Sequence, residues 1–447
     1  MSADHIDMGA GSVFKTLVRL SVPAMISMFF ETLYSLIDTI FVAKLGTIPL
    51  AGMSLAVPFL FIGMALSKGV AIGSLALMSH ARGSNRHGTA EKIAASAFPL
   101  ILLFVGVLVL LALPSVNRPI FALFDNHSGL INEADHYTRW LALSFPSIGF
   151  TMLCEAIFFS YGDTKTPMQA MIAGNILNII LDPFLIFYCN MGVAGASFAS
   201  LLGWTLSGFI MWQALKKRNL NRPRIEYSRD QIKLWPQIIS LGIPVTLSML
   251  IIPISIAVLN YLLAGFGPAY VGAWNMSTRI ERMVVMPLYG ISSALIPFVA
   301  FNLGLKRPDR IIKGCKTALL TCYILIIPTV LFFWFYAGTF IAVFKPSPEV
   351  LNLATFALKI AGLGYFFTPF ELILTGLAQG LKQPKYSLLT NVLRLLVIRL
   401  PLAFLFAEKM GGHGIYISHP VSLTISGIAS FFLIRQLFKE QQQEDLS

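Results

Sequence analysis

Twelve long apolar stretches, joined by short polar segments, limit what this chain of 447 residues can fold into. Each stretch is long enough to cross the hydrocarbon core of a bilayer, which takes about 20 residues of helix. Only 12% of the residues are charged, whereas soluble domains contain about 25%. The sequence therefore predicts an all-α membrane protein with twelve transmembrane helices. These are expected near residues 16–43, 50–79, 93–113, 136–161, 167–189, 194–215, 236–264, 270–301, 317–337, 351–379, 386–407 and 414–438.

The basic residues are distributed unevenly among the polar segments. If the N-terminus is cytoplasmic, 22 of the 33 lysines and arginines fall in cytoplasmic segments and four fall outside. By the positive-inside rule, this asymmetry predicts that both termini are cytoplasmic. The residues before the first stretch do not resemble a cleaved signal peptide, so we expect that stretch to be retained. The net charge of +12 then reflects topology and contact with anionic lipid headgroups, not nucleic-acid binding.

From Pro23 to Lys92 the chain matches its second half at a constant shift of 221 residues, and farther along the chain the shift drifts. Pro23 pairs with Pro244 at this shift, and Gly46 pairs with Gly267. Six spans per repeat predict two bundles related by a pseudo-twofold axis along the membrane normal. The expected parts are an N-terminal six-helix bundle (1–215), a basic cytoplasmic linker (216–235), a C-terminal six-helix bundle (236–438) and a cytoplasmic tail (439–447).

The first predicted helix contains two carboxylic acids, Glu31 and Asp38. A charge at the centre of a spanning helix costs about 2.5–3.5 kcal/mol on insertion scales, so such residues usually face protein or water and serve function. The two acids are seven residues apart and share one helix face, with Tyr34 between them. Hydrogen bonding between helices is the structural alternative, and we favour a functional role.

The fifth predicted helix carries a second polar group. Asn178 and Asp182 are four residues apart and share a face, with Asn175 one turn earlier. Pro183 follows at once; it has no N–H and crowds the carbonyl of Ile179. A carboxylate, an amide and a freed carbonyl together would suit a proton, a hydronium ion or Na⁺.

The second half of the chain lacks these acids. Asp38 aligns with Leu259, Asn178 aligns with Arg394, and Asp182 falls opposite an apolar or basic position. The repeat therefore predicts an ion-binding group in the first half only.

A mixed, largely basic group takes the place of the acids in the second half. Its arginines either pair internally with Glu281 and Glu371 or line an anion-binding site. Glu155 and Glu371 are related by the repeat, so a shared packing role is at least as plausible for them as a role in transport. The members of the basic group are Arg279, Glu281, Arg282, Arg394 and Arg399.

Several chemistries are excluded by the motifs. Residues 83–90, "GSNRHGTA", have glycines at P-loop spacing but lack the Lys-Ser/Thr that must follow. The chain has no HExxH and no GxSxG. We therefore expect no enzyme activity and no cofactor, and we expect transport to be driven by an ion gradient. Four cysteines show no zinc spacing and are expected in the core: Cys154, Cys189, Cys315 and Cys322.

The chain resembles the multidrug and toxic compound extrusion (MATE) family over nearly its whole length. The resemblance rests on the two six-helix halves, on "LSVPAMISMFFETLYSLIDTIFVAKLG" in the first span, and on "GDTKTPM" leading to "NILNIILDP". It is strongest for the prokaryotic branch called DNA-damage-inducible protein F, which has an aspartate in the first span and an Asn…Asp pair in the fifth. These would be Asp38, Asn178 and Asp182. The likeness adds Tyr34 and a hydroxyl in the sixth span, for which Ser200 is the nearest match.

The resemblance implies efflux of organic, often cationic, drug-like compounds across the cytoplasmic (inner) membrane of a prokaryote, in exchange for H⁺ or Na⁺. Burial and a nearby like charge both favour the neutral form of a carboxyl. We therefore expect one of Asp38 and Asp182 to exchange a proton near neutral pH. Na⁺ bound at Asp38, Asn178 and Asp182 is the alternative, and no other metal is expected. The expected functional unit is a monomer.

A substrate cavity is expected beside these acids, because Met and aromatic side chains repack around varied ligands. Bending at Pro23 would change the cavity when the acids are protonated, and Pro183 is a second bending point. Ordinary helix packing explains the apolar members equally well. The expected cavity residues are Met25, Met28, Phe29, Phe30, Glu31, Tyr34 and Asn175.

Two competing hypotheses remain. An exporter of lipid-linked or anionic saccharide precursors is related in fold and is favoured by the arginines of the second half, although such proteins often have fourteen spans. An intramembrane enzyme or scaffold lacks a catalytic motif and does not explain the unequal halves. The first is tested by comparing how the purified protein binds organic dyes and polyprenyl phosphates. The second is tested by adding an uncoupler to cells, because collapse of dye efflux would indicate a transporter.

Overall fold

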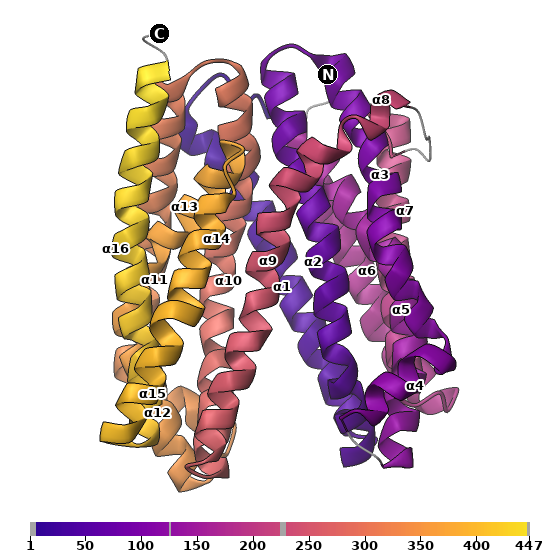
Figure 1. Cartoon of the computed structure of the whole chain (residues 1–447), viewed down its shortest axis with the longest axis vertical. Coiled ribbons are helices and arrows are strands. Elements are labelled where there is room, and N and C mark those ends of the chain that lie inside the picture. The colour runs from indigo at the N-terminus through magenta and orange to yellow at the C-terminus, as the bar shows by residue number, and fades with distance from the viewer. Residues whose placement is uncertain (1–5, 125–126, 224–228, 445–447) are drawn as a thin grey trace. The chain divides into compact units, whose positions relative to one another are not determined.

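The structure is a computed structural model that describes residues 6–124, 127–223 and 229–444, and this part of the chain is all helical (Figure 1). Residues 224–228 of the expected linker and 445–447 of the expected tail lie outside the described residues, as do 1–5 and 125–126. The elements are α1 (Val13–Ala43), α2 (Thr47–Gly83), α3 (His87–Val109), η1 (Leu110–Ala112), α4 (Pro114–Ala122), α5 (Ser128–Ser160), α6 (Lys165–Pro183), η2 (Phe184–Tyr188), α7 (Val193–Lys217), α8 (Arg229–Ile232), α9 (Trp235–Ala264), α10 (Pro268–Gly304), α11 (Pro308–Ala342), α12 (Pro348–Tyr365), α13 (Thr368–Gly380), α14 (Lys385–Val392), η3 (Leu393–Ile398), α15 (Arg399–Met410) and α16 (Gly412–Glu444).

Eleven spans of the described chain are continuous and apolar enough to cross a membrane. The number is twelve if the bent pair α12 and α13, whose axes differ by 53°, counts as one span. The predicted all-α fold is confirmed, but the stretch 351–379 is not one straight helix. Pro369 accounts for the break, because proline has no N–H to continue the ladder and disfavours helical geometry at the preceding residue.

The described residues divide into two compact units. Unit 1 contains residues 6–9 and 26–246, and unit 2 contains residues 10–25 and 247–444. One boundary lies inside α1, after Met25, and the other lies inside α9, after Thr246. These two positions are 221 residues apart, which is the shift that relates the two halves of the sequence.

In unit 1, glycines allow helices to approach closely. A Cβ atom on Gly69 of α2 would lie 2.8 Å from the carbonyl oxygen of Gly242 in α9. Gly73, one turn later, faces the backbone of Ile238 in the same way. The GxxxG pair of α2 therefore serves helix packing.

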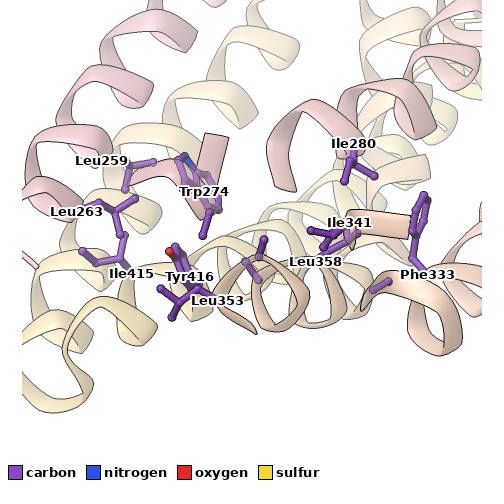
Figure 2. Close-up of a cluster of buried hydrophobic side chains, with 14 of the residues drawn as sticks. Leu259, Leu263, Trp274, Ile280, Phe333, Ile341, Leu353, Leu358, Ile415 and Tyr416 are labelled. Carbon is purple, nitrogen blue, oxygen red and sulfur yellow. The ribbon is translucent and has the colours of Figure 1, made fainter. Parts of the chain in front are cut away.

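In unit 2, a buried apolar cluster joins α9, α10, α11, α12, α15 and α16 (Figure 2). Trp274 and Tyr416 stack with ring centroids 5.9 Å apart. The Tyr416 hydroxyl donates to the backbone oxygen of Tyr270 at 2.7 Å, so its polar end is satisfied within the cluster. Leu259, which aligns with Asp38 of the first half, is fully buried in this core.

Candidate functional site

The polar side chains of α1, α6 and α7 come together inside unit 1. Asp38 is 5% exposed, Asn178 is 2% exposed and Asp182 is fully buried. The Asn178 amide donates a hydrogen bond to the hydroxyl of Ser200 on α7, over 3.2 Å. Asp38 and Asp182 are close enough to interact electrostatically, although 144 residues separate them in the sequence. The structure therefore groups four residues that the sequence singles out; we call these four the acid site.

Two glycines explain why α6 and α7 lie close enough for this grouping. A Cβ atom on Gly174 would collide with the carbonyl oxygen of Gly203, and one on Gly203 would lie 2.8 Å from that of Gly174. The Ser207 hydroxyl also crosses the contact and donates to the backbone oxygen of Ala170 at 3.1 Å. Small residues thus bring the two backbones together one turn from the Asn178–Ser200 hydrogen bond.

Several oxygens of the acid site have no hydrogen-bond partner among the described residues. They are Oδ1 of Asp38, both carboxylate oxygens of Asp182 and the amide oxygen of Asn178. An unpaired polar group that is buried in an apolar medium carries a large free-energy cost. These acceptors, without matching donors, suit a proton, a water molecule or a small cation.

A small cavity adjoins the acid site, with room for about one water molecule. Its walls include Tyr34, Asn175 and Trp204. The Trp204 side chain lies beside that of Tyr34. Tyr34 interacts electrostatically with Asp38 and Asp182, which places the predicted tyrosine at the site.

Two residues of this region were missed by reasoning from the sequence. Trp204 contacts Tyr34, and Tyr137 on α5 interacts electrostatically with Asp38, Asp182 and Tyr34. Their aromatic side chains occur in apolar helices, where they cannot be distinguished from packing residues. Only the meeting of α5 and α7 with α1 and α6 reveals them.

A second polar group in unit 1 surrounds Lys68 of α2. Lys68 interacts electrostatically with Glu31 on α1 and with Glu155 on α5. Lys68 was not singled out by reasoning from the sequence, although a single charge within an apolar span is the signal that could have identified it. The sequence placed Glu31 and Glu155 separately, whereas the structure links them through one lysine.

The residues of the expected substrate wall are divided between the two units. Met28, Phe29 and Phe30 belong to unit 1, and the Phe29 ring is 52% exposed. Met25 belongs to unit 2, where it lies against Gly290 of α10. The described structure therefore does not group all of these side chains within a single unit.

The two prolines expected to bend helices differ in their surroundings. α1 continues through Pro23 without a break, and the boundary between the units follows three residues later. Pro183 ends α6, and a π-helical turn, η2, follows it. π-Helical turns are rare and frequently occur at functional sites.

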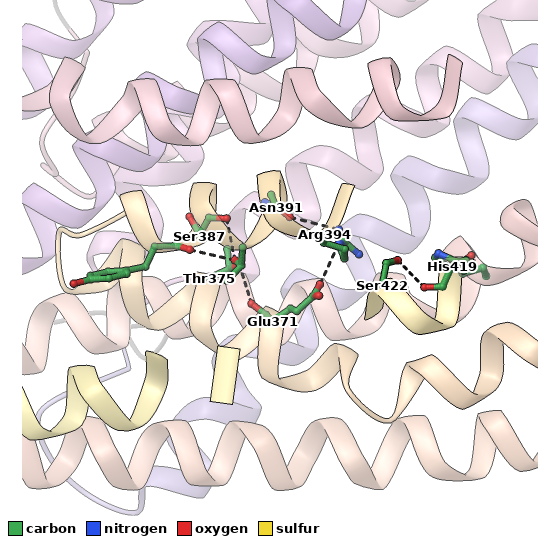
Figure 3. A network of polar contacts seen from close by, with 10 residues as sticks. Glu371, Thr375, Ser387, Asn391, Arg394, His419 and Ser422 are labelled. Carbon is green, nitrogen blue, oxygen red and sulfur yellow. Dashed lines mark hydrogen bonds and ion pairs between the residues drawn. The ribbon is translucent and has the colours of Figure 1, made fainter. Parts of the chain in front are cut away.

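The charged group of unit 2 is organised by pairing (Figure 3). Nε of Arg394 lies 3.3 Å from Oε2 of Glu371, and Arg394 also donates to the Asn391 side-chain oxygen over 3.4 Å. Glu281 lies 3.0 Å from Nε2 of His419. The expected internal pairing is thus present for Arg394, and His419 is a partner that the sequence did not suggest.

The remaining basic residues differ in how deeply they are buried. Arg279 and Arg282 of α10 are exposed, whereas Arg399 is only 6% exposed. The Arg399 guanidinium lies over the ring of Trp274, 5.0 Å from its centroid.

Among the described residues, no three or more His, Cys, Asp or Glu side chains are grouped to hold a metal ion. The acid site offers two carboxylates and an amide. Na⁺ at Asp38, Asn178 and Asp182 therefore stays a prediction.

Comparison with protein families gives one family, matched twice. The family model described as MatE matches residues 23–184 and again residues 244–405. The second match begins and ends 221 residues after the first, at the shift found within the sequence. The two matches together span most of the chain.

Curated relatives cover almost the full chain at low identity. The chain is 29% identical over 436 residues to a protein named FAD transporter from Shewanella oneidensis, covering 95% of this chain and 94% of that protein. It is 24% identical over 426 residues to the multidrug export protein MepA of Staphylococcus saprophyticus, with the same coverage.

Solved structures share the fold. An outward-facing structure of a multidrug resistance MATE family transporter of the MOP superfamily matches with a TM-score of 0.91 and 24% identity, over 99% of this chain and 100% of the other. A MOP superfamily transporter from Pyrococcus furiosus, described as having a binding pocket of reverse polarity, matches with a TM-score of 0.90 and 25% identity, over 99% of both chains.

Proposed function

Because this chain belongs to the MatE family of membrane transporters, we propose that it exports organic, often cationic, compounds in exchange for protons bound at Asp38 and Asp182. One observation carries this proposal. Both acids are buried within helices long and apolar enough to span a membrane, with carboxylate oxygens that have no partner among the described residues. Such acids are costly in a bilayer, and function is the usual reason that they are retained.

Proton binding would change the charge of the acid site. With both carboxylates ionised, Asp38 and Asp182 repel each other in a medium of low dielectric constant. A proton taken up from outside would remove that repulsion, and its release inside would restore a negative site that attracts a cation. Asn178 and Ser200 would orient the proton-binding group through their hydrogen bond. Na⁺ is the less favoured coupling ion.

The coupling step is proposed to pass through α1. This helix carries Asp38 in unit 1, while its first part, with Pro23, belongs to unit 2. A helix interrupted by proline lacks one backbone hydrogen bond and bends more easily there. Protonation at Asp38 would bend α1 near Pro23 and alter the surroundings of the substrate, with Pro183 as the second bending point.

The substrate is proposed to contact side chains near the acid site. Tyr34 and Asn175 line the small cavity. The candidates in addition to these two are Met25, Met28, Phe29, Phe30 and Glu31. The export of drug-like compounds is supported by the multidrug export proteins among the relatives.

The finer assignments are proposals of the same kind. We propose membership of the branch called DNA-damage-inducible protein F, supported by an aspartate on α1 and the Asn178–Asp182 pair on α6. The proposed location is the inner membrane of a prokaryote, supported by bacterial relatives, with both termini cytoplasmic. The chain would act as a monomer, with functional bundles at residues 1–215 and 236–438 joined by the linker 216–235.

Inverted membrane vesicles test the proposal directly. Ethidium accumulation would be followed by fluorescence while a pH gradient and a sodium gradient are imposed separately. We expect accumulation when the vesicle interior is acidic, and collapse of that accumulation when an uncoupler is added. Accumulation that follows only the sodium gradient would transfer the coupling role to Na⁺, and no response to either gradient would refute gradient-driven export.

Anionic compounds are the second candidate class of substrate. The arginines of unit 2 favour it, and so does the relative named FAD transporter. Lipid-linked or anionic saccharide precursors belong to the same class. Competition between organic dyes and polyprenyl phosphates for binding to the purified protein would distinguish the two classes.

A further inference from the structure

A pocket of about 310 Å³ lies in unit 2, where α11, α13 and α16 pack against one another (Figure 1). Leu319 of α11, Phe370 of α13 and Phe431 of α16 belong to its apolar wall. Lys316 of α11 and Arg435 of α16 also line the pocket, and none of the described residues that line it is acidic. The pocket therefore combines an apolar wall with two cations and no counter-charge in its lining.

The two cations lie at the ends of their predicted membrane spans. Lys316 directly precedes the predicted span 317–337, and Arg435 lies in the last turn of the predicted span 414–438. Both side chains are exposed. Leu319 and Phe431 lie about one turn farther into these spans, so the apolar wall extends from the cations toward the hydrocarbon core. The headgroups of the lipids lie at the level of the cations, and the acyl chains lie at the level of the wall.

Contacts within unit 2 hold the aromatic part of the wall in place. The Arg435 guanidinium lies over the ring of Phe431, 5.6 Å from its centroid. Phe431 packs edge-on against Phe370, with centroids 5.5 Å apart. Phe370 in turn packs edge-on against Tyr323, whose hydroxyl donates to the backbone oxygen of Phe366 at 2.9 Å. The cation and the apolar wall are therefore joined in one packed arrangement.

The repeat places a second pocket at the equivalent position of unit 1. This pocket has a volume of about 350 Å³ and is lined by residues of α3, α5 and α7. Phe98 in its lining corresponds to Leu319 at the shift of 221. Trp212 corresponds to Phe431 at a shift of 219, because the shift has drifted this far along the chain. The same helices thus form an apolar pocket in both repeats.

The two pockets differ in charge. Lys216 lies over the ring of Trp212, 5.8 Å from its centroid, and corresponds to Arg435 at the shift of 219. Each repeat therefore has one cation on the aromatic ring of its pocket. Ala95, however, occupies the position that corresponds to Lys316. Only the pocket of unit 2 has a second cation, so it has the greater complementarity to a negatively charged group.

We propose that the pocket of unit 2 binds one anionic phospholipid, with its phosphate group at Lys316 and Arg435. An acyl chain would lie along Leu319, Phe370 and Phe431. The guanidinium offers N–H donors in a fork that matches two phosphate oxygens, and the ammonium group adds a second charge. The net charge of +12 attracts anionic headgroups over the whole surface, whereas this pocket would hold a single lipid. Such binding requires neither proton coupling nor a particular substrate.

Two phospholipids with the same acyl chains test the charge preference. Dioleoylphosphatidylglycerol is anionic, and dioleoylphosphatidylcholine has no net charge. Each would be titrated into the purified full-length protein in detergent micelles, and the complexes would be counted by native mass spectrometry. We expect the first phosphatidylglycerol to bind about tenfold more tightly than the first phosphatidylcholine. Glycerol 3-phosphate, which has no acyl chain, should not displace it.

Substitutions assign the preference to the pocket. Lys316→Gln combined with Arg435→Gln is expected to remove most of the preference for phosphatidylglycerol. Lys313→Gln combined with Lys439→Gln is the matched control, because it removes two exposed lysines from the same two helices and should leave the preference intact. Leu319→Trp keeps both cations but fills the apolar pocket, so it should weaken the binding of both lipids.

Equal binding of the two lipids by the wild-type protein would overturn the proposal. A preference unchanged in the double variant of the pocket, or reduced as much in the control, would also overturn it, because the charge preference would then belong to the basic surface as a whole. Displacement of the lipid by glycerol 3-phosphate, or undiminished lipid binding by Leu319→Trp, would show that the apolar wall holds no acyl chain.

Discussion

The side-chain amide of Asn178 donates a hydrogen bond to the Ser200 hydroxyl over 3.2 Å, and this bond engages the N–H₂ end of the amide. With its N–H₂ engaged by Ser200, Asn178 presents an oxygen that has no partner among the described residues. Both carboxylate oxygens of Asp182, on the same helix face, also have no hydrogen-bond partner among the described residues. Acceptors without donors are thus concentrated at one place, which is the arrangement that a proton or cation would complete.

Asp38→Asn should abolish transport driven by a pH gradient while leaving the protein folded. The substitution keeps the shape of the side chain but removes the group that would bind and release a proton. Ethidium accumulation in inverted vesicles measures the effect, with Asp309→Asn, an exposed acid in the first turn of α11, as the matched control. Wild-type accumulation by the Asp38→Asn variant would refute proton coupling at this residue.

Gly203→Ala should destabilise unit 1 and disturb the acid site together. The added Cβ would lie 2.8 Å from the Gly174 carbonyl oxygen and 3.3 Å from Cβ of Asn178, so α6 and α7 must separate. Overpacking of this kind costs about 1–3 kcal/mol, and thermal unfolding in detergent would measure it.

Gly106→Ala in α3 is the matched control, because nothing lies within 4 Å of its new Cβ. At this position, replacing glycine by alanine inside a helix is expected to leave the stability unchanged or to raise it by about 0.5–1 kcal/mol. Equal melting temperatures for the two variants would contradict the close contact of α6 and α7.

Asp163→Ala should lower stability by about 2–3 kcal/mol through loss of a helix cap and an ion pair. The buried carboxylate accepts from the backbone N–H groups of Lys165 and Thr166 at 3.0 and 2.9 Å, at the start of α6. It also pairs with Arg218, directly after α7, at 2.7 Å. Asp309→Ala is the control, since it removes an exposed acid near a helix start. If the melting temperature of Asp163→Ala is unchanged from wild type, the capping role is refuted.

The fold follows from the sequence because its strongest signals are local. A span is recognised from about 20 consecutive apolar residues, and the repeat is recognised from identities at one shift, which the family matches reproduce. The break between α12 and α13 was not foreseen, although Pro369 supplies its cause. An apolar stretch sets the length of a span, but it does not set whether the helix is straight.

Only part of the acid site can be predicted from the sequence. Spacing along one helix predicts that Asn178 and Asp182 share a face, but it does not identify the neighbouring helix. The role of Trp204 and the acidic partners of Lys68 therefore became visible only through contacts made across helices. His419 was missed for the same reason, since its carboxylate partner, Glu281, lies 138 residues away in the chain.

Glu371→Gln should weaken the protein without removing proton coupling. Nε of Arg394 lies 3.3 Å from the Glu371 carboxylate, and the substitution would leave this guanidinium buried without its counter-charge. Breaking a buried pair from one side costs about 3 kcal/mol, so we expect a lower melting temperature in detergent. Adding Arg394→Gln should recover much of the loss, because the double variant has no unpaired charge at this place. Glu349→Gln, at an exposed acid in the first turn of α12, controls for the change in net charge.

Ethidium accumulation driven by a pH gradient should persist at a reduced rate in Glu371→Gln, since Asp38 and Asp182 are unchanged. Complete loss of accumulation in a folded, normally expressed Glu371→Gln protein would instead assign proton coupling to the second half of the chain.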